Sequence, residues 1–148
     1  MKKQIKTLFI SLVLLAACGK SDQHQHQDDA KSSDNPNQAL YDQVMSVHDE
    51  IMPKSDQLYQ LKKELQGKIA KSTELNEDQK RRLTQTIEQL DSADHSMMDW
   101  MHKFKPLPDS ANQELAREYL ENEMEHIKKV RDLINSSLEK AKEELGKK

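Results

Sequence analysis

Apolar residues recur along most of the chain at steps of three, four or seven positions, the spacing of one face of an α-helix. The first repeating set is Leu40, Val44, Val47, Ile51, Leu58, Leu61, Leu65 and Ile69. Asn35 followed by Pro36 predicts the start of this helix, because Asn caps helices and Pro suits the first helical position. Pro53 removes one backbone hydrogen bond, so a kink is expected near residues 47–51, and the helix should fade over residues 67–72.

Two later segments repeat with the same period. The second set is Leu83, Ile87, Leu90, Met97, Met101 and Phe104, and the third is Leu120, Ile127, Val130, Ile134, Leu138 and Ala141. Asn76 with Gln79 predicts a capping box at the start of the second helix, and Ser110 with Gln113 predicts one at the start of the third. Each segment is therefore expected to form one helix.

The helix ends and the short connections between helices set the expected topology. Pro106 and Pro108 should end the second helix, and Gly146 should end the third. Connections of roughly five residues join helices that run in opposite directions, so neighbouring helices should be antiparallel. The sequence therefore predicts an all-α fold, an antiparallel up-down-up three-helix bundle over residues 36–146.

Residues 1–17 have a different pattern, in which Lys2, Lys3 and Lys6 precede an apolar run over residues 8–17. A basic start followed by about ten apolar residues is typical of a secretory signal peptide. The run is too short to cross a membrane, which takes about 20 residues. The sequence therefore predicts export of the chain and removal of this segment.

The signal peptide ends in Leu15-Ala16-Ala17-Cys18-Gly19, which resembles the lipobox of bacterial lipoproteins. This resemblance implies that the Cys18 thiol is diacylglycerated, that cleavage occurs before Cys18, and that the new amino terminus is acylated. Two or three acyl chains, at about 0.8 kcal/mol per buried CH₂, would make the membrane anchor effectively permanent. Gly19 is not the Asp that some bacteria use for inner-membrane retention, so we expect a cell-envelope protein anchored in the outer rather than the inner membrane. The alternative is an ordinary signal peptide with an incidental Cys.

Residues 18–35 connect the acylated Cys to the helices and contain no large apolar side chain. Such a segment cannot offset the entropy lost on ordering, so a disordered tether is expected. His24 and His26 lie within it and could bind metal weakly, although histidines in a Gln-rich spacer are more often simply solvated.

Composition and charge exclude several classes of function. The chain has 148 residues, 4% aromatic and 33% charged, with three Gly and one Cys, which disfavours β folds, nucleotide-binding loops, internal disulfides and zinc fingers. Removal of residues 1–17 takes away three lysines and leaves 20 basic against 26 acidic residues, a net charge of −6. An acidic chain of this kind gives no reason to expect nucleic acid as a partner.

Histidine and methionine gather on the expected helices. The candidate ligands, in two stripes with the spacing i, i+3, i+7 and one further pair, are Met45, His48 and Met52, then His95, Met98 and His102, then Met124 and His126. Antiparallel packing would bring all three groups to the same end of the bundle. Thioether and imidazole ligands on facing helices suit soft or borderline metals, above all Cu(I), and a non-covalent haem held between His and Met is a further option.

The same stripes are also consistent with ordinary helix packing or with a binding groove. Met is an ordinary gap-filler in helical cores, and a His at the edge of a core commonly bonds a neighbouring carboxylate. A Met-rich groove could instead bind a peptide or another protein. Two carboxylates, Asp94 and Glu123, are expected to face inward, where they could join His48 in holding a harder metal.

An enzyme is not expected. The serines fall in turns or on polar faces, and a bundle of this size leaves little room for a substrate cavity of several hundred Å³. Asp94 and Glu123 could form an acid–base pair, but inward carboxylates can equally pair with basic side chains of a neighbouring helix.

Three segments resemble those of a group of small lipoproteins from Bacteroidetes that carry the label "viral A-type inclusion protein". They are Val47-His48-Asp49-Glu50-Ile51-Met52-Pro53-Lys54, Met97-Met98-Asp99-Trp100-Met101-His102-Lys103-Phe104, and residues 119–131 from Tyr119-Leu120-Glu121 to Lys128-Lys129-Val130-Arg131. The label says nothing about activity, and the group offers no catalytic residues to carry over. The resemblance implies a helical lipoprotein.

The sequence thus predicts a membrane-anchored envelope lipoprotein that acts as a structural or protein-interaction module, by binding an envelope partner or by self-association, and that requires no cofactor. The alternative is an extracytoplasmic lipoprotein that binds copper or haem.

Overall fold

The computed structural model describes residues 35–108 and 110–147, all of which belong to one unit of the chain. The predicted signal peptide, the lipobox with Cys18, and the tether up to residue 34 lie outside the described residues. Every regular element among the described residues is a helix, so the predicted all-α class is confirmed for this part of the chain.

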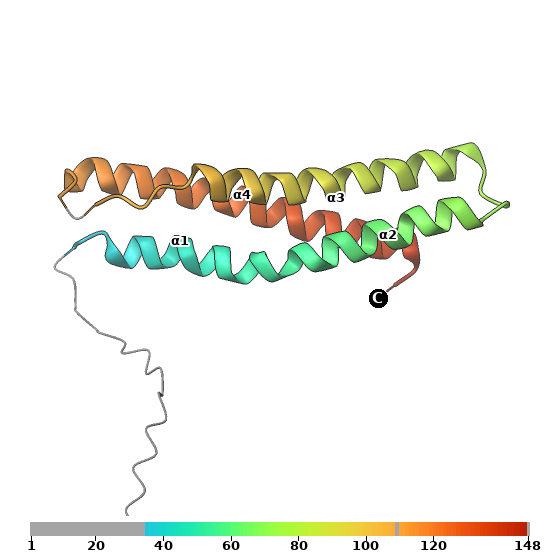
Figure 1. Ribbon diagram of the computed structural model, residues 1–148, viewed down its shortest axis with the longest axis horizontal. Coiled ribbons are helices and arrows are strands. Elements are labelled where there is room, and N and C mark those ends of the chain that lie inside the picture. The colour runs from blue at the N-terminus through green and yellow to red at the C-terminus, as the bar shows by residue number, and fades with distance from the viewer. Residues whose placement is uncertain (1–34, 109, 148) are drawn as a thin grey trace, which may run out of the picture. The chain divides into compact units, whose positions relative to one another are not determined.

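The helices are α1 (Gln38–Ile51), the 3₁₀ turn η1 (Met52–Lys54), α2 (Ser55–Lys71), α3 (Glu77–Lys103) and α4 (Gln113–Leu145). Figure 1 shows α1, η1 and α2 in one line, with α3 and α4 lying lengthwise beside them. α4 packs against α1, α2 and α3, and α2 also packs against α3. The described residues therefore pack in the manner of a helical bundle.

The first helical segment is interrupted at Pro53. Regular helix continues to Ile51, and the break falls at Met52–Lys54, slightly later than the kink expected near residues 47–51. Pro53 has no N–H to donate to the carbonyl of Asp49, and its ring crowds that carbonyl, so the chain tightens into a 3₁₀ turn. The helix then continues through Gly67 to Lys71.

The predicted start of α1 was two residues too early. The helix begins at Gln38 with Asn37 at the N-cap, and Asn35 and Pro36 lie in the turn before it. The Asn35 side chain accepts a hydrogen bond from the Asn37 N–H at 2.9 Å. The buried Asn37 side chain donates to the carbonyl of Gln113 at 2.9 Å and so joins the start of α1 to the start of α4.

Asn76 and Gln79 form the predicted capping box at the start of α3, with reciprocal hydrogen bonds of 2.9 Å. The box predicted for α4 was wrong, because its N-cap is Asn112 rather than Ser110. The Asn112 side chain accepts from the backbone N–H groups of Glu114 and Leu115 at 3.0 and 3.1 Å.

The helix ends agree with the sequence. α3 stops at Lys103, before Pro106 and Pro108. α4 ends at Leu145, and the next residue, Gly146, has a φ of 70°, a left-handed conformation that favours glycine.

Replacing Asn76 by alanine should lower the free energy of unfolding by about 1 kcal/mol, because the Gln79 N–H in the first turn of α3 loses its acceptor. Urea denaturation followed by circular dichroism measures the change. Asn122→Ala, an exposed Asn inside α4, is the matched control and should cost nothing, since Ala favours a helix interior. Equal losses in the two variants would contradict the capping role.

The buried faces of the helices form one hydrophobic core, whose largest fully buried apolar side chains are Val44, Ile51, Leu58, Leu65, Leu83, Leu90, Met97, Ile127 and Ile134. These positions belong to the apolar repeats seen in the sequence. Thr86 and Ser137 are the polar exceptions within the described helices, and each donates its hydroxyl hydrogen to a helix carbonyl, that of Arg82 or Gln89.

Candidate functional site

An aromatic cluster lies where α1 begins, α3 ends and α4 begins. The Trp100 ring stacks on Phe104 with a centroid distance of 4.8 Å, and Phe104 stacks on Tyr119 of α4 at 6.1 Å. From α1, Tyr41 lies 6.0 Å from Phe104, and His48 lies 5.9 Å from Trp100. These five side chains define the aromatic cluster and join the three helical segments at this end.

The apolar repeats of the sequence included Phe104 but not Trp100, Tyr41 or Tyr119. Tyr41 precedes Val44 by three positions, so its spacing fits the first apolar repeat. Tyr119 lies next to Leu120, at the edge of the third repeat. Both tyrosines could have been included by treating their rings as apolar.

The α1 stripe faces this cluster. His48 is 20% exposed at its side chain, and its Nδ1 lies 2.8 Å from Oδ1 of Asp49. Met45 of α1 and Met52 of η1 are half-buried, and Met52 packs against the core. The His48 ring lies beside the Trp100 ring, so this stripe contacts α3 through an aromatic side chain.

The α3 stripe is a surface feature. His95 and His102 are exposed, and Met98 between them is 38% exposed. The His95 Nδ1 donates to the carbonyl of Asp91 in its own helix at 2.8 Å. That bond holds the His95 ring against its own helix, and only Nε2 is left to bind another group.

The α4 pair is divided between core and surface. Met124 is buried in the core, whereas His126 is exposed, with its Nδ1 3.7 Å from Oε1 of Glu123. Across residues 35–108 and 110–147, no group of three or more His, Cys, Asp or Glu side chains is placed to hold a metal ion. The structure therefore separates the eight candidate ligands into a half-buried stripe, an exposed stripe and a divided pair.

The two inward carboxylates, Asp94 and Glu123, are both half-buried, but they have different neighbours. Asp94 borders a small cleft of about 70 Å³ with Tyr59 and Lys62 of α2. Glu123 lies beside His126 and close to Tyr119. The two carboxylates therefore belong to separate surroundings rather than to one acid–base pair.

Tyr119 is the titratable member of the aromatic cluster whose environment is unusual. Its hydroxyl oxygen accepts a hydrogen bond from the backbone N–H of Lys105 at 2.8 Å. Burial raises the pKa of Tyr119 above its ordinary value of 10.0, and the negative charge of Glu123 raises this pKa further, while the Lys105 bond acts in the opposite direction. The folded state thus favours the neutral phenol.

Tyr119→Phe should cost about 1 kcal/mol of unfolding free energy at pH 7, because the Lys105 N–H loses its acceptor. Since folding raises the Tyr119 pKa, its contribution is fully present below pH 10 and is lost as the pH rises above 10. Stability measured by urea denaturation from pH 8 to 11 should therefore fall more steeply in the wild type than in Tyr119→Phe. Parallel profiles would contradict the raised pKa.

Within the described part of the chain, no helix is both long enough and apolar enough to cross a membrane. Comparisons of the chain with protein-family models, with curated proteins and with solved structures found no match.

Proposed function

We propose that this protein is a membrane-anchored lipoprotein of the bacterial cell envelope, whose helical part acts as a non-enzymatic structural or protein-interaction module. The observation that carries the proposal is the division of each helix into a buried apolar stripe and a charged outer face. The outer faces carry ion pairs within single helices, such as Lys80 with Glu77 and Arg117 with Glu121. Such pairs contribute little to stability, so another molecule can bind these faces and replace the pairs at little cost in free energy.

The proposed arrangement is an up-down-up bundle. Hydrogen bonds join the first helical segment to α4 and the residues at its ends, among them Asn37 to Gln113, Lys54 to Asn135, and Lys147 to Glu64. Residue numbers increase in the same direction along the two segments, which supports a parallel orientation of the first helical segment and α4. Against α3 the order is reversed, since Tyr41 lies at Phe104 and Lys62 pairs with Asp91 at 2.6 Å. The turn at residues 72–76 and the connection at 104–112 are consistent with this order.

The anchor is proposed to be Cys18, acylated after removal of residues 1–17, with the tether leading to Asn35. Detergent phase partition and membrane fractionation test this. The wild-type chain should enter the detergent phase and remain with membranes after a high-salt wash. The Cys18→Ser chain should stay in the aqueous phase and be released from membranes by the wash. A Cys18→Ser chain that has lost residues 1–17 and still stays on washed membranes would contradict an anchor at this residue.

Self-association of the helical part is a separate question with its own measurement. Sedimentation of the Cys18→Ser chain over a range of concentrations distinguishes a single copy from a concentration-dependent dimer. A dimer would support a structural role, and a single copy would favour a different envelope protein as the partner.

One observation favours metal binding as a second candidate function. Asp49 holds Nδ1 of His48, which is the pattern by which proteins orient an imidazole so that Nε2 can bind a metal. Met45 of α1 and Met52 of η1 lie three positions before and four positions after His48, and thioether with imidazole suits Cu(I). These three residues are the candidate site, and a non-covalent haem on the same side chains is its variant.

Thermal unfolding of the Cys18→Ser chain with Cu(I), Cu(II), Zn(II) or haem tests this candidate. A ligand at a hundredfold excess over its Kd stabilises the folded state by about 2.7 kcal/mol. The gain should vanish in His48→Ala and persist in His126→Ala, whose ring is exposed. Absence of a shift with all four ligands would exclude the candidate and leave the stripes as packing.

A further inference from the structure

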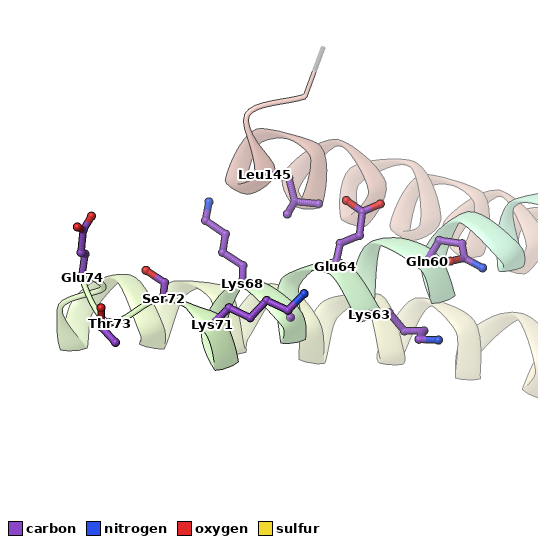
Figure 2. Close-up of a pocket in the computed structure, with 10 residues that line it drawn as sticks. Gln60, Lys63, Glu64, Lys68, Lys71, Ser72, Thr73, Glu74 and Leu145 are labelled. Carbon is purple, nitrogen blue, oxygen red and sulfur yellow. The ribbon is translucent and has the colours of Figure 1, made fainter.

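An open groove lies where α2 and α4 both end, at the opposite end of the helices from the aromatic cluster. It has a volume of about 810 Å³ and is lined mainly by one face of α2. In Figure 2, Lys68 and Glu64 extend from α2 toward the end of α4, where Leu145 faces the groove, and Lys71 extends along α2. We refer to this feature as the Gly67 groove.

Gly67 lies in the interior of α2, where glycine destabilises a helix relative to alanine. Its backbone is not among those with positive φ, so the helix conformation does not require glycine. A Cβ built at this position would meet nothing within 4 Å, so packing does not require glycine either. A side chain here would instead occupy the groove. The lack of a side chain at Gly67 leaves the α2 backbone accessible from the groove at this position.

Basic side chains outnumber acidic ones along the groove by one. Lys63, Lys68 and Lys71 line it, and the acidic residues at its edge are Glu64 and Glu74. Glu64 is already paired with Lys147, and Lys68 donates to the carbonyl of Glu144. Lys63 lies 5.4 Å from the Tyr59 ring, and no described residue forms a hydrogen bond or ion pair with Lys71. The groove therefore carries net positive charge on a chain whose mature form is acidic overall.

The position of the groove favours a protein over a lipid headgroup. An α-helix rises by 1.5 Å per residue, so the groove at Gly67 lies about 45 Å along the helix axis from the start of α1. The proposed tether ends close to the start of α1, and therefore far from the groove. A site that served to hold the membrane would be expected at the tethered end.

We propose that the Gly67 groove docks an acidic peptide segment of another envelope protein. Carboxylates of the segment meet Lys63 and Lys71, and an apolar side chain lies over Gly67 against Leu145. This inference rests on the proposed role as a protein-interaction module and names the chemistry of its partner.

Site-specific photo-cross-linking of the full-length anchored chain in its own cells tests the proposal. The cross-linking amino acid benzoylphenylalanine is placed at Gln60, which lines the groove, and in a separate variant at Met98 on the exposed α3 stripe. Mass spectrometry then identifies the cross-linked segment. We expect Gln60 to capture one segment rich in Asp and Glu.

Charge reversal provides the matched comparison. Lys63→Glu with Lys71→Glu should reduce the Gln60 cross-link at least tenfold, whereas Lys128→Glu with Lys129→Glu, the same charge change on exposed positions of α4, should leave it unchanged. Gly67→Trp should also remove the cross-link by filling the groove. Gly67→Ala should raise Tm by about 4 °C, which shows that position 67 tolerates a side chain.

The outcomes separate this inference from the function on which it rests. Capture of a second copy of this chain, capture of lipid, or a cross-link that survives charge reversal would overturn the acidic-segment proposal. Capture of a protein at Met98 but not at Gln60 would overturn the groove and leave the interaction module intact. Absence of protein capture at both positions would count against both.

Discussion

Replacing Trp100 by alanine should lower the free energy of unfolding by about 3–5 kcal/mol, the largest effect expected for a single substitution in this chain. Trp100 is 6% exposed, stacks on Phe104 and lies beside His48, so its removal leaves a cavity between α1 and α3. The neighbouring helices can fill that cavity only in part. Urea denaturation followed by circular dichroism measures the loss. Tryptophan fluorescence cannot be used, because Trp100 is the single tryptophan of the chain.

Two further variants show whether this loss comes from the buried ring. Trp100→Phe should cost much less than alanine, because Phe keeps an aromatic ring and removes an indole N–H that has no partner among the described residues. Tyr59→Ala, at an aromatic side chain that is 56% exposed, should change stability by less than about 1 kcal/mol. A loss below about 1 kcal/mol in Trp100→Ala would contradict the position of Trp100 in the core.

Met97→Ala should cost about 2–5 kcal/mol, whereas Met98→Ala should cost less than about 1 kcal/mol. Both positions carry the same side chain on the same helix, but Met97 is fully buried and Met98 is 38% exposed. The pair therefore isolates burial from helix propensity, because both substitutions introduce the same residue. Urea denaturation at pH 7 gives both values.

The same pair distinguishes packing from binding in the stripes. If Met98 belonged to a packed core, its removal would destabilise the chain as strongly as removal of Met97. Equal losses would contradict the surface position of the α3 stripe. A small loss for Met98 leaves this exposed stripe available for contact with another molecule.

Local signals in the sequence predicted the helices well, because each depends on residues close together in the chain. The apolar repeats identify the buried faces of α1 to α4, and the box of Asn76 and Gln79 requires only a spacing of three. The cap of α4 was missed because two residues near its start can accept backbone bonds. Asn112 lies directly before the first helical residue and bonds two N–H groups, which Ser110 is too far away to reach.

Features that depend on contact between helices could not be predicted in the same way. The spacing of the His and Met stripes places each on one helix face but does not fix what the neighbouring helix puts opposite. Trp100 occupies the space beside His48, and Met124 turns into the core while His126 faces outward. The Gly67 groove was not foreseen either, since it exists only where the end of α2 meets Leu145 of α4.

Intact mass spectrometry of the protein extracted from membranes most directly tests its proposed identity as a lipoprotein. We expect a chain that begins at Cys18, lacks residues 1–17, and carries the added mass of a diacylglyceryl group with or without one further acyl chain. Cys18→Ser should carry no lipid mass. A wild-type chain that retains residues 1–17, or one that has lost them and carries no lipid, would contradict the membrane anchor at Cys18.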